Sequence, residues 1–155
     1  MRKDVEKMEG ILLIDQKLTP HVTVLEYACR CGGCNLGRYA KDINWDILYC
    51  FEEIRAAAHN YPFIINSGCR CKIHNIEVVG SLNSSHLRCS ALDIIPVGGW
   101  NQFQMTTGIS KDNFIEICDN IIGDGGLGYV KYGKFGIVHI DRDPELMKTK
   151  PQRRW

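Results

Sequence analysis

Three residues of the sequence could together bind a catalytic zinc ion: His86, Asp93 and His139. Two imidazoles and one carboxylate form a recurrent ligand set for such a site, in which three protein donors leave a fourth position for water. The first two residues belong to the stretch 64–95, where most of the residue types able to do chemistry are concentrated. The third lies in the later segment Gly136–Asp141. A catalytic metal site is therefore the first hypothesis.

The separation of His86 and Asp93 excludes a regular element between them. Seven residues of straight helix would place them about 10 Å apart along the axis, and seven extended residues would place them more than roughly 20 Å apart. Donor atoms must lie about 2 Å from a zinc ion, so the chain must fold back. The small residues Cys89, Ser90 and Ala91 permit this. The pair alone is a weak signal, because the same spacing occurs in many chains that bind no metal.

The segment Ile137–Asp141 is predicted to be a strand that presents the third ligand. Side chains alternate along a strand, so Val138 and Ile140 would face the core while His139 and Asp141 share the opposite face. A histidine on a strand is more often a structural residue than a ligand. In this position, the carboxylate of Asp141 could act as a general base, or it could orient the imidazole of His139.

Two amphipathic segments are predicted to form the core helices. Asn44 precedes the first at its cap position, and apolar residues then recur at helical spacing up to Asn60. Ser110 caps the second, which Gly123 ends. The other expected elements are short: strands at 63–66 and 93–95, a helix at 71–79, a strand or extended lead-in at 21–27, and a hairpin with strands 127–132 and 135–140 joined at Gly133-Lys134.

Length and composition indicate one globular domain over residues 1–155. The 155 residues are 45% hydrophobic and 24% charged, which is ordinary for a folded protein. The net charge of +1 gives no general attraction to nucleic acid or membrane, and no apolar run could span a bilayer. The basic residues near both ends are expected to be solvated tails. The apolar run Ile11–Ile14 is too short for a signal peptide, so we expect no export by a signal of its own.

Five of the eight cysteines fall into two groups. Cys50 and Cys118 fall at apolar positions of the core helices and are interpreted as small buried side chains. The cluster Cys29-x-Cys31-x-x-Cys34 could be part of a metal site, half of a disulfide pair, or a reduced loop. A zinc ribbon needs a second Cys-x-x-Cys pair, and the sequence has none. A second zinc ion in this cluster is therefore possible but not the favoured interpretation.

Four motifs follow one another along the chain: Ser67-Gly68-Cys69-Arg70, His74-Asn75, Ser84-x-His86-x-x-Cys89-x-Ala91-x-Asp93 and Gly136-Ile137-Val138-His139-Ile140-Asp141. In this order they resemble the zinc D-Ala-D-Ala peptidases of family M15, especially a small subgroup common in phages and gut bacteria. The resemblance covers about residues 20–142. Together the motifs are far more specific than the spacing of any one pair of residues.

The resemblance implies a fold, a reaction and roles for particular residues. The fold would be α+β, a small antiparallel sheet flanked by helices as in the hedgehog and D-Ala-D-Ala peptidase group. His86, Asp93 and His139 would bind zinc, and Arg70 and Ser84 would bind a peptidoglycan stem peptide for cleavage as a carboxypeptidase or endopeptidase. Asp141 is our choice for the general base. We expect a monomer that stays in the cytoplasm until release to the cell wall, in keeping with a phage or prophage origin.

Two departures from the family pattern leave an alternative open. Cys89 stands where the family usually has glycine, so a left-handed backbone there would be strained, and its thiol could compete as a metal ligand. Gly136 stands where several relatives carry an acidic residue three positions before the last histidine. The alternative is a non-catalytic cell-wall-binding or virion-associated protein that keeps the fold and the metal site.

Overall fold

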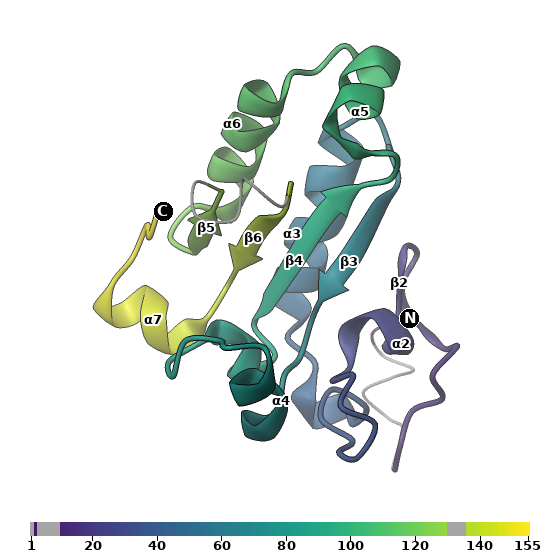
Figure 1. The fold of residues 1–155 in the computed structure, drawn as a ribbon, viewed down its shortest axis with the longest axis vertical. Helices are drawn as coiled ribbons and strands as arrows, with labels where there is room; N and C mark the ends of the chain where they lie inside the picture. The colour runs from purple at the N-terminus through teal and green to yellow at the C-terminus, as the bar shows by residue number, and fades with distance from the viewer. Residues whose placement is uncertain (1, 3–9, 130–135) are drawn as a thin grey trace.

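The fold is built on a four-stranded antiparallel sheet, seen in a computed structural model that describes residues 2, 10–129 and 136–155. The strand order is β3-β4-β6-β5. Their bounds are Phe63–Ser67 for β3, Ala91–Pro96 for β4, Val138–Asp141 for β6 and Gly126–Gly128 for β5. This arrangement with its flanking helices confirms the predicted α+β class (Figure 1).

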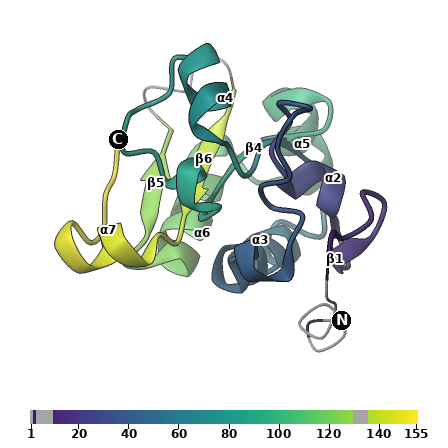
Figure 2. The ribbon, with the colours of Figure 1, turned by 90° about the horizontal axis from the view of Figure 1, so that it is seen from below.

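Two helices cover one face of this sheet, and both were predicted. They are α3 (Trp45–Ala57) and α6 (Lys111–Ile122), which lie on the same side of the strands in Figures 1 and 2. The Asn44 side chain accepts a hydrogen bond from the Ile47 amide, and the Ser110 side chain accepts one from the Asn113 amide. Each cap satisfies an amide that has no partner inside its helix.

The hydrophobic core lies between the sheet and these helices. Val138 and Ile140 of β6 are fully buried in it, as alternation along the strand predicted. An aromatic cluster closes one end, where Phe114 stacks on Phe63 with ring centroids 5.2 Å apart. Each such buried side chain contributes about 1.5–3 kcal/mol relative to exposure. Since the core occupies this face, the opposite face of β4 and β6 is available for polar residues.

The segment before the sheet is helical where an extended strand was one expectation. Residues 17–19 and 22–23 form the short antiparallel pair β1 (Lys17–Thr19) and β2 (Val22–Thr23), and α2 (Val24–Tyr27) follows at once. The Thr23 side chain accepts from the Glu26 amide while the Glu26 carboxylate accepts from the Thr23 amide. This reciprocal capping box begins a helix in spite of the β-branched sequence, because it satisfies two amides together.

Two further helices carry weak sequence signals and were not predicted. The helix α5 (Gly99–Thr107) buries only Phe103, so it shows little apolar periodicity. The helix α7 (Pro144–Thr149) buries no residue and is capped by Asp143. Three short elements complete the described chain: α4 (Lys72–Glu77) and the 3-10 turns η1 (Ala40–Asp42) and η2 (Ser85–Arg88). None of the helices in the described ranges has the length and apolar character that a membrane span requires.

The C-terminal residues pack on the sheet and are not the solvated tail that was expected. The Leu127 amide donates to the Arg153 carbonyl at 2.9 Å, and the Tyr129 amide donates to the Trp155 carbonyl at 2.7 Å. These bonds continue the sheet beyond β5, because the outer edge of that strand offers backbone groups that need partners. The hairpin pairing of β5 with β6 is confirmed. Its predicted turn at Gly133-Lys134 lies outside the described residues.

Candidate metal centre and active site

The structure brings His86, Asp93 and His139 together. Asp93 on β4 and His139 on β6 are directly opposite each other in the strand register. His86 comes from η2, which lies against the end of the sheet. The Asp93 Oδ1 atom is 2.8 Å from His139 Nδ1, and its Oδ2 atom is 3.2 Å from His86 Nε2. One donor atom from each residue lies within 4.8 Å of the others, so one ion can contact all three.

The predicted chain reversal between His86 and Asp93 occurs at Cys89. This residue ends η2 in the left-handed conformation, with φ of 54° and ψ of 24°. Such a conformation costs an L residue roughly 1–2 kcal/mol. The buried Tyr27 hydroxyl donates to the Cys89 carbonyl at 2.6 Å, which helps to fix the turn. The chain then enters β4 with Asp93 facing His86.

The donor atoms of His86 and Asp93 are arranged to bind a cation. The His86 Nδ1 atom lies 2.6 Å from the Gly68 carbonyl oxygen, so Nδ1 carries the proton and Nε2 presents a lone pair. That buried Nε2 atom has no hydrogen-bond partner in the described part of the chain. It faces the Asp93 carboxylate, also an acceptor. Two facing acceptors are unfavourable unless a cation lies between them, and zinc fits this donor set.

The electrostatics of the cluster follow from burial and from the two carboxylates. Burial lowers the pKa of His86, which keeps its imidazole neutral as a ligand must be. Burial would also lower the pKa of His139, yet hydrogen bonds with Asp141 and Asp93 outweigh it and raise that pKa to about 9, so a metal ion binding this imidazole would release a proton from it. For Asp93, burial is outweighed by the neighbouring imidazoles, which hold the pKa of its carboxyl well below the usual range.

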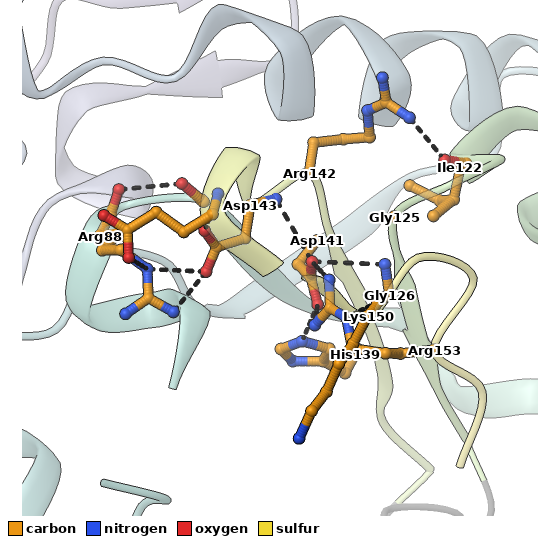
Figure 3. A network of polar contacts seen from close by, with 12 residues as sticks. Arg88, Ile122, Gly125, Gly126, His139, Asp141, Arg142, Asp143, Lys150 and Arg153 are labelled. Atoms are coloured by element: carbon orange, nitrogen blue, oxygen red, sulfur yellow. Dashed lines mark hydrogen bonds and ion pairs between the residues drawn. The ribbon is translucent and has the colours of Figure 1, made fainter. Parts of the chain in front are cut away.

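Asp141 is fully buried, and its carboxylate contacts the His139 ring (Figure 3). Its Oδ2 atom is 3.2 Å from His139 Nε2, while His139 Nδ1 faces Asp93. Arg153 donates to both carboxylate oxygens, at 3.1 and 2.6 Å. A side chain at Gly126 would have its Cβ 2.1 Å from Asp141 Oδ2, so glycine is required beside this carboxylate. Burial would raise the pKa of Asp141, but His139 and Arg153 hold it low.

Several residues around the centre carried no recognisable sequence signal. Asp143 is fully buried and receives a hydrogen bond from Arg88 Nε at 2.8 Å. The Trp155 ring lies 5.3 Å from the His139 ring, between centroids. Arg153 and Trp155 reach the centre only because the C-terminal segment pairs with β5. A motif search in the sequence has no means of detecting such a long-range pairing.

Arg70 and Ser84 line the same pocket as the three candidate ligands, a cavity of about 570 Å³. Arg70 is buried and donates to Asn75 Oδ1 and Ser67 Oγ, each at 3.0 Å. Its NH2 atom is 3.6 Å from Asp93 Oδ2. The Ser84 hydroxyl oxygen accepts from the His86 amide at 3.3 Å. All the residues selected from sequence for the site thus converge on one cavity.

Cys89 does not offer a competing thiol, because the structure joins it to Cys69 in a disulfide. Cys69 lies in the first of the four motifs and Cys89 in the third. The bond connects the segment that carries Arg70 to the turn that carries His86. It therefore offsets the cost of the left-handed backbone at Cys89 by holding that turn in place.

We expect the double variant Cys69→Ala/Cys89→Ala to lose about 3 kcal/mol of unfolding free energy, the typical value for a closed loop of this size. Urea unfolding without reductant would measure it. Cys50→Ala is the control, since Cys50 is buried in α3 and is a free thiol. Finding both Cys69 and Cys89 alkylated after unfolding without reductant would contradict the pairing.

One of the comparisons with known proteins found a match, to a protein family. The family model described as Peptidase M15 matches residues 20–141, which include every candidate ligand. No curated protein and no solved structure matches the chain significantly. The family match spans most of the chain and all of the candidate ligands. The chain therefore belongs to the peptidase M15 family.

Proposed function

We propose that the protein is a zinc-dependent peptidase that cleaves peptidoglycan stem peptides, as a D-Ala-D-Ala carboxypeptidase or an endopeptidase. The observation that carries the proposal is the buried lone pair of His86, which faces Asp93 and His139 in an open pocket. Membership of the peptidase M15 family supports a hydrolytic role for this pocket. The choice of peptidoglycan rests on the resemblance of the sequence motifs to D-Ala-D-Ala peptidases.

Zinc held by His86, Asp93 and His139 would polarise the scissile carbonyl group and lower the pKa of water toward neutrality. The protein's own residues would bind and orient the peptide. The Arg70 guanidinium suits a bidentate contact with a substrate carboxylate, or with the negative charge that develops on the carbonyl oxygen. The Ser84 hydroxyl, on the wall of the pocket, could donate to the peptide backbone.

For Asp141 the contacts favour an orienting role over the general-base role expected from sequence. Its carboxylate lies against His139 Nε2 and is bound by Arg153, whereas Nδ1 of the same ring faces Asp93. A carboxylate in this position fixes the tautomer and the angle of the imidazole. Asp93 and Asp141 are the only carboxylates among the described residues that line the pocket. With Asp93 proposed as a metal ligand, Asp141 is the remaining candidate for the general base among these carboxylates, so the test of its role also tests whether it is the base.

Removing the metal should abolish hydrolysis. We expect the purified protein to release D-alanine, or to cut cross-links, from muropeptides, to lose this activity after chelation and dialysis, and to regain it with added zinc. Mass spectrometry of the products identifies the bond that is cleaved. Hydrolysis that persists at full rate without zinc would contradict the proposal.

A non-catalytic wall-binding protein is the second candidate, and two observations favour it. Gly136 occupies the position of the acidic residue found in several relatives, and the Asp141 carboxylate is already bound by Arg153. This candidate predicts that the protein binds zinc and sediments with purified peptidoglycan but releases no product from any muropeptide. The same digestion assay therefore separates the two functions.

A further inference from the structure

A second cluster of candidate metal ligands lies outside the active-site pocket. It consists of the side chains of Cys29, Cys31, Cys34 and Cys71, named here the four-cysteine cluster. Their sulfur atoms all lie within 4.8 Å of one another, and none of the four forms a disulfide. In a tetrahedral zinc site with Zn–S bonds of about 2.3 Å, neighbouring sulfurs are about 3.8 Å apart. A small contraction of the cluster would reach that geometry.

The fourth cysteine is the one that sequence spacing did not identify. Cys71 directly follows Arg70 and reaches the loop 29–34 because the two segments are closely packed. The Cys69 amide donates to the Tyr27 carbonyl at 2.7 Å. A Cβ atom at Gly68 would lie 2.3 Å from that carbonyl oxygen, and one at Gly37 would lie 2.6 Å from the Cys69 sulfur. Glycine at both positions therefore permits the approach that completes the set.

Backbone amides point at three of the four sulfur atoms. The Cys31 sulfur accepts from the amides of Gly33 and Cys34, at 3.4 and 3.2 Å. The Cys29 sulfur accepts from the Cys71 amide at 3.3 Å, and the Cys71 sulfur accepts from the His74 amide at 3.4 Å. Amide donors stabilise negative charge on an acceptor, so they favour thiolates, which are the form that binds metals. The contact to the Cys71 sulfur also caps the helix α4.

We propose that the four-cysteine cluster binds one structural zinc ion, separate from the His86, Asp93 and His139 site. Four sulfur ligands complete a tetrahedral shell and leave no position for water, so this ion takes no part in hydrolysis. It joins the loop after α2 to the start of α4 and thereby fixes the segment that carries Arg70. Two zinc ions are then bound per chain, one at each site.

Zinc content of matched variants tests the proposal on the full-length chain. The variants are Cys31→Ser/Cys34→Ser for the cluster, His86→Ala/His139→Ala for the other site, and Cys50→Ser as the cysteine control. We expect two zinc ions in the wild type and in the control, and one in each double variant. Loss of metal from the histidine variant alone would overturn the four-cysteine proposal and leave the proposed catalytic site intact. If only the cysteine variant loses an ion, the four-cysteine proposal is supported and the proposed catalytic zinc site is overturned.

Cobalt spectroscopy gives a second readout, and its first measurement needs only the wild-type protein. After zinc is replaced by Co²⁺, the wild-type protein should show intense near-ultraviolet thiolate-to-cobalt charge transfer. The histidine variant should keep this absorption, and Cys31→Ser/Cys34→Ser should lose it. Wild-type protein without charge transfer would overturn the proposal, as would iron in place of zinc, or a disulfide between any two of the four cysteines in protein purified with its metal.

Discussion

His86→Ala should lose both bound metal and activity at the proposed catalytic site. The substitution removes a ligand whose Nε2 atom is buried and directed at Asp93. We expect the affinity of that site to fall by more than the roughly 10–100-fold typical of losing an outer hydrogen-bond partner. Peptide hydrolysis should fall to background with it. Isothermal titration with zinc and a muropeptide assay on the same protein measure the two effects.

Two companion variants separate ligand loss from general damage to the fold. His86→Ala also leaves the Gly68 carbonyl without its buried donor, which costs about 1–3 kcal/mol. Asp93→Asn keeps the shape of the side chain but removes the anionic ligand, so it should lose metal with little unfolding. His59→Asn removes an exposed imidazole at a left-handed position that asparagine tolerates, and should change neither property. Full hydrolysis by a folded His86→Ala protein would refute the assignment.

Asp141→Asn should weaken metal binding more than it slows the chemical step. If Asp141 orients His139, zinc affinity should fall by about 10–100-fold while activity at saturating zinc is largely retained. If Asp141 is instead the general base, zinc affinity should be unchanged and kcat should fall by about 10²–10⁴-fold. We expect the first result, because Arg153 binds both oxygens of this carboxylate and His139 Nε2 contacts one of them.

Asp143→Asn is the matched control for this experiment. Asp143 is also fully buried just beyond β6 and is also bound by an arginine, Arg88, while its other carboxylate oxygen accepts from the Glu145 amide. Asp143→Asn should lower the free energy of unfolding and leave the zinc affinity of the His86, Asp93 and His139 site unchanged. A drop in zinc affinity equal to that of Asp141→Asn would show that both variants act through the fold and not through His139.

The candidate ligands could be predicted from sequence because their signals are local. Val138 and Ile140 alternate with His139 and Asp141. These four consecutive positions therefore predict both the strand and which side chains share each of its faces. The helix α6 could also be predicted from local sequence, because Ser110 and Gly123 mark its ends. Joining these pieces into one metal site required the resemblance to a family, since spacing alone left His86 and Asp93 a weak pair.

The parts that sequence analysis missed depend on long-range packing. Arg153 contacts Asp141 only after the C-terminal segment has paired with β5. Cys71 joins Cys29 only after the Arg70 segment has packed against the end of α2. The β-branched residues of the segment 21–27 predicted an extended backbone, but the hydrogen bonds of a capping box stabilise a helix over Val24–Tyr27. In each case a tertiary or side-chain contact outweighed the local pattern.

The position of Arg70 between Cys69 and Cys71 makes the pocket sensitive to redox conditions in both directions. One neighbour is held by a disulfide to Cys89, and the other belongs to the four-cysteine cluster. Reductants attack the first anchor, whereas oxidants attack thiols such as those of the second. The backbone on both sides of Arg70 is therefore anchored only where a disulfide and reduced thiols persist together. Preparations made under strong reduction or strong oxidation should lose substrate binding before they lose their fold.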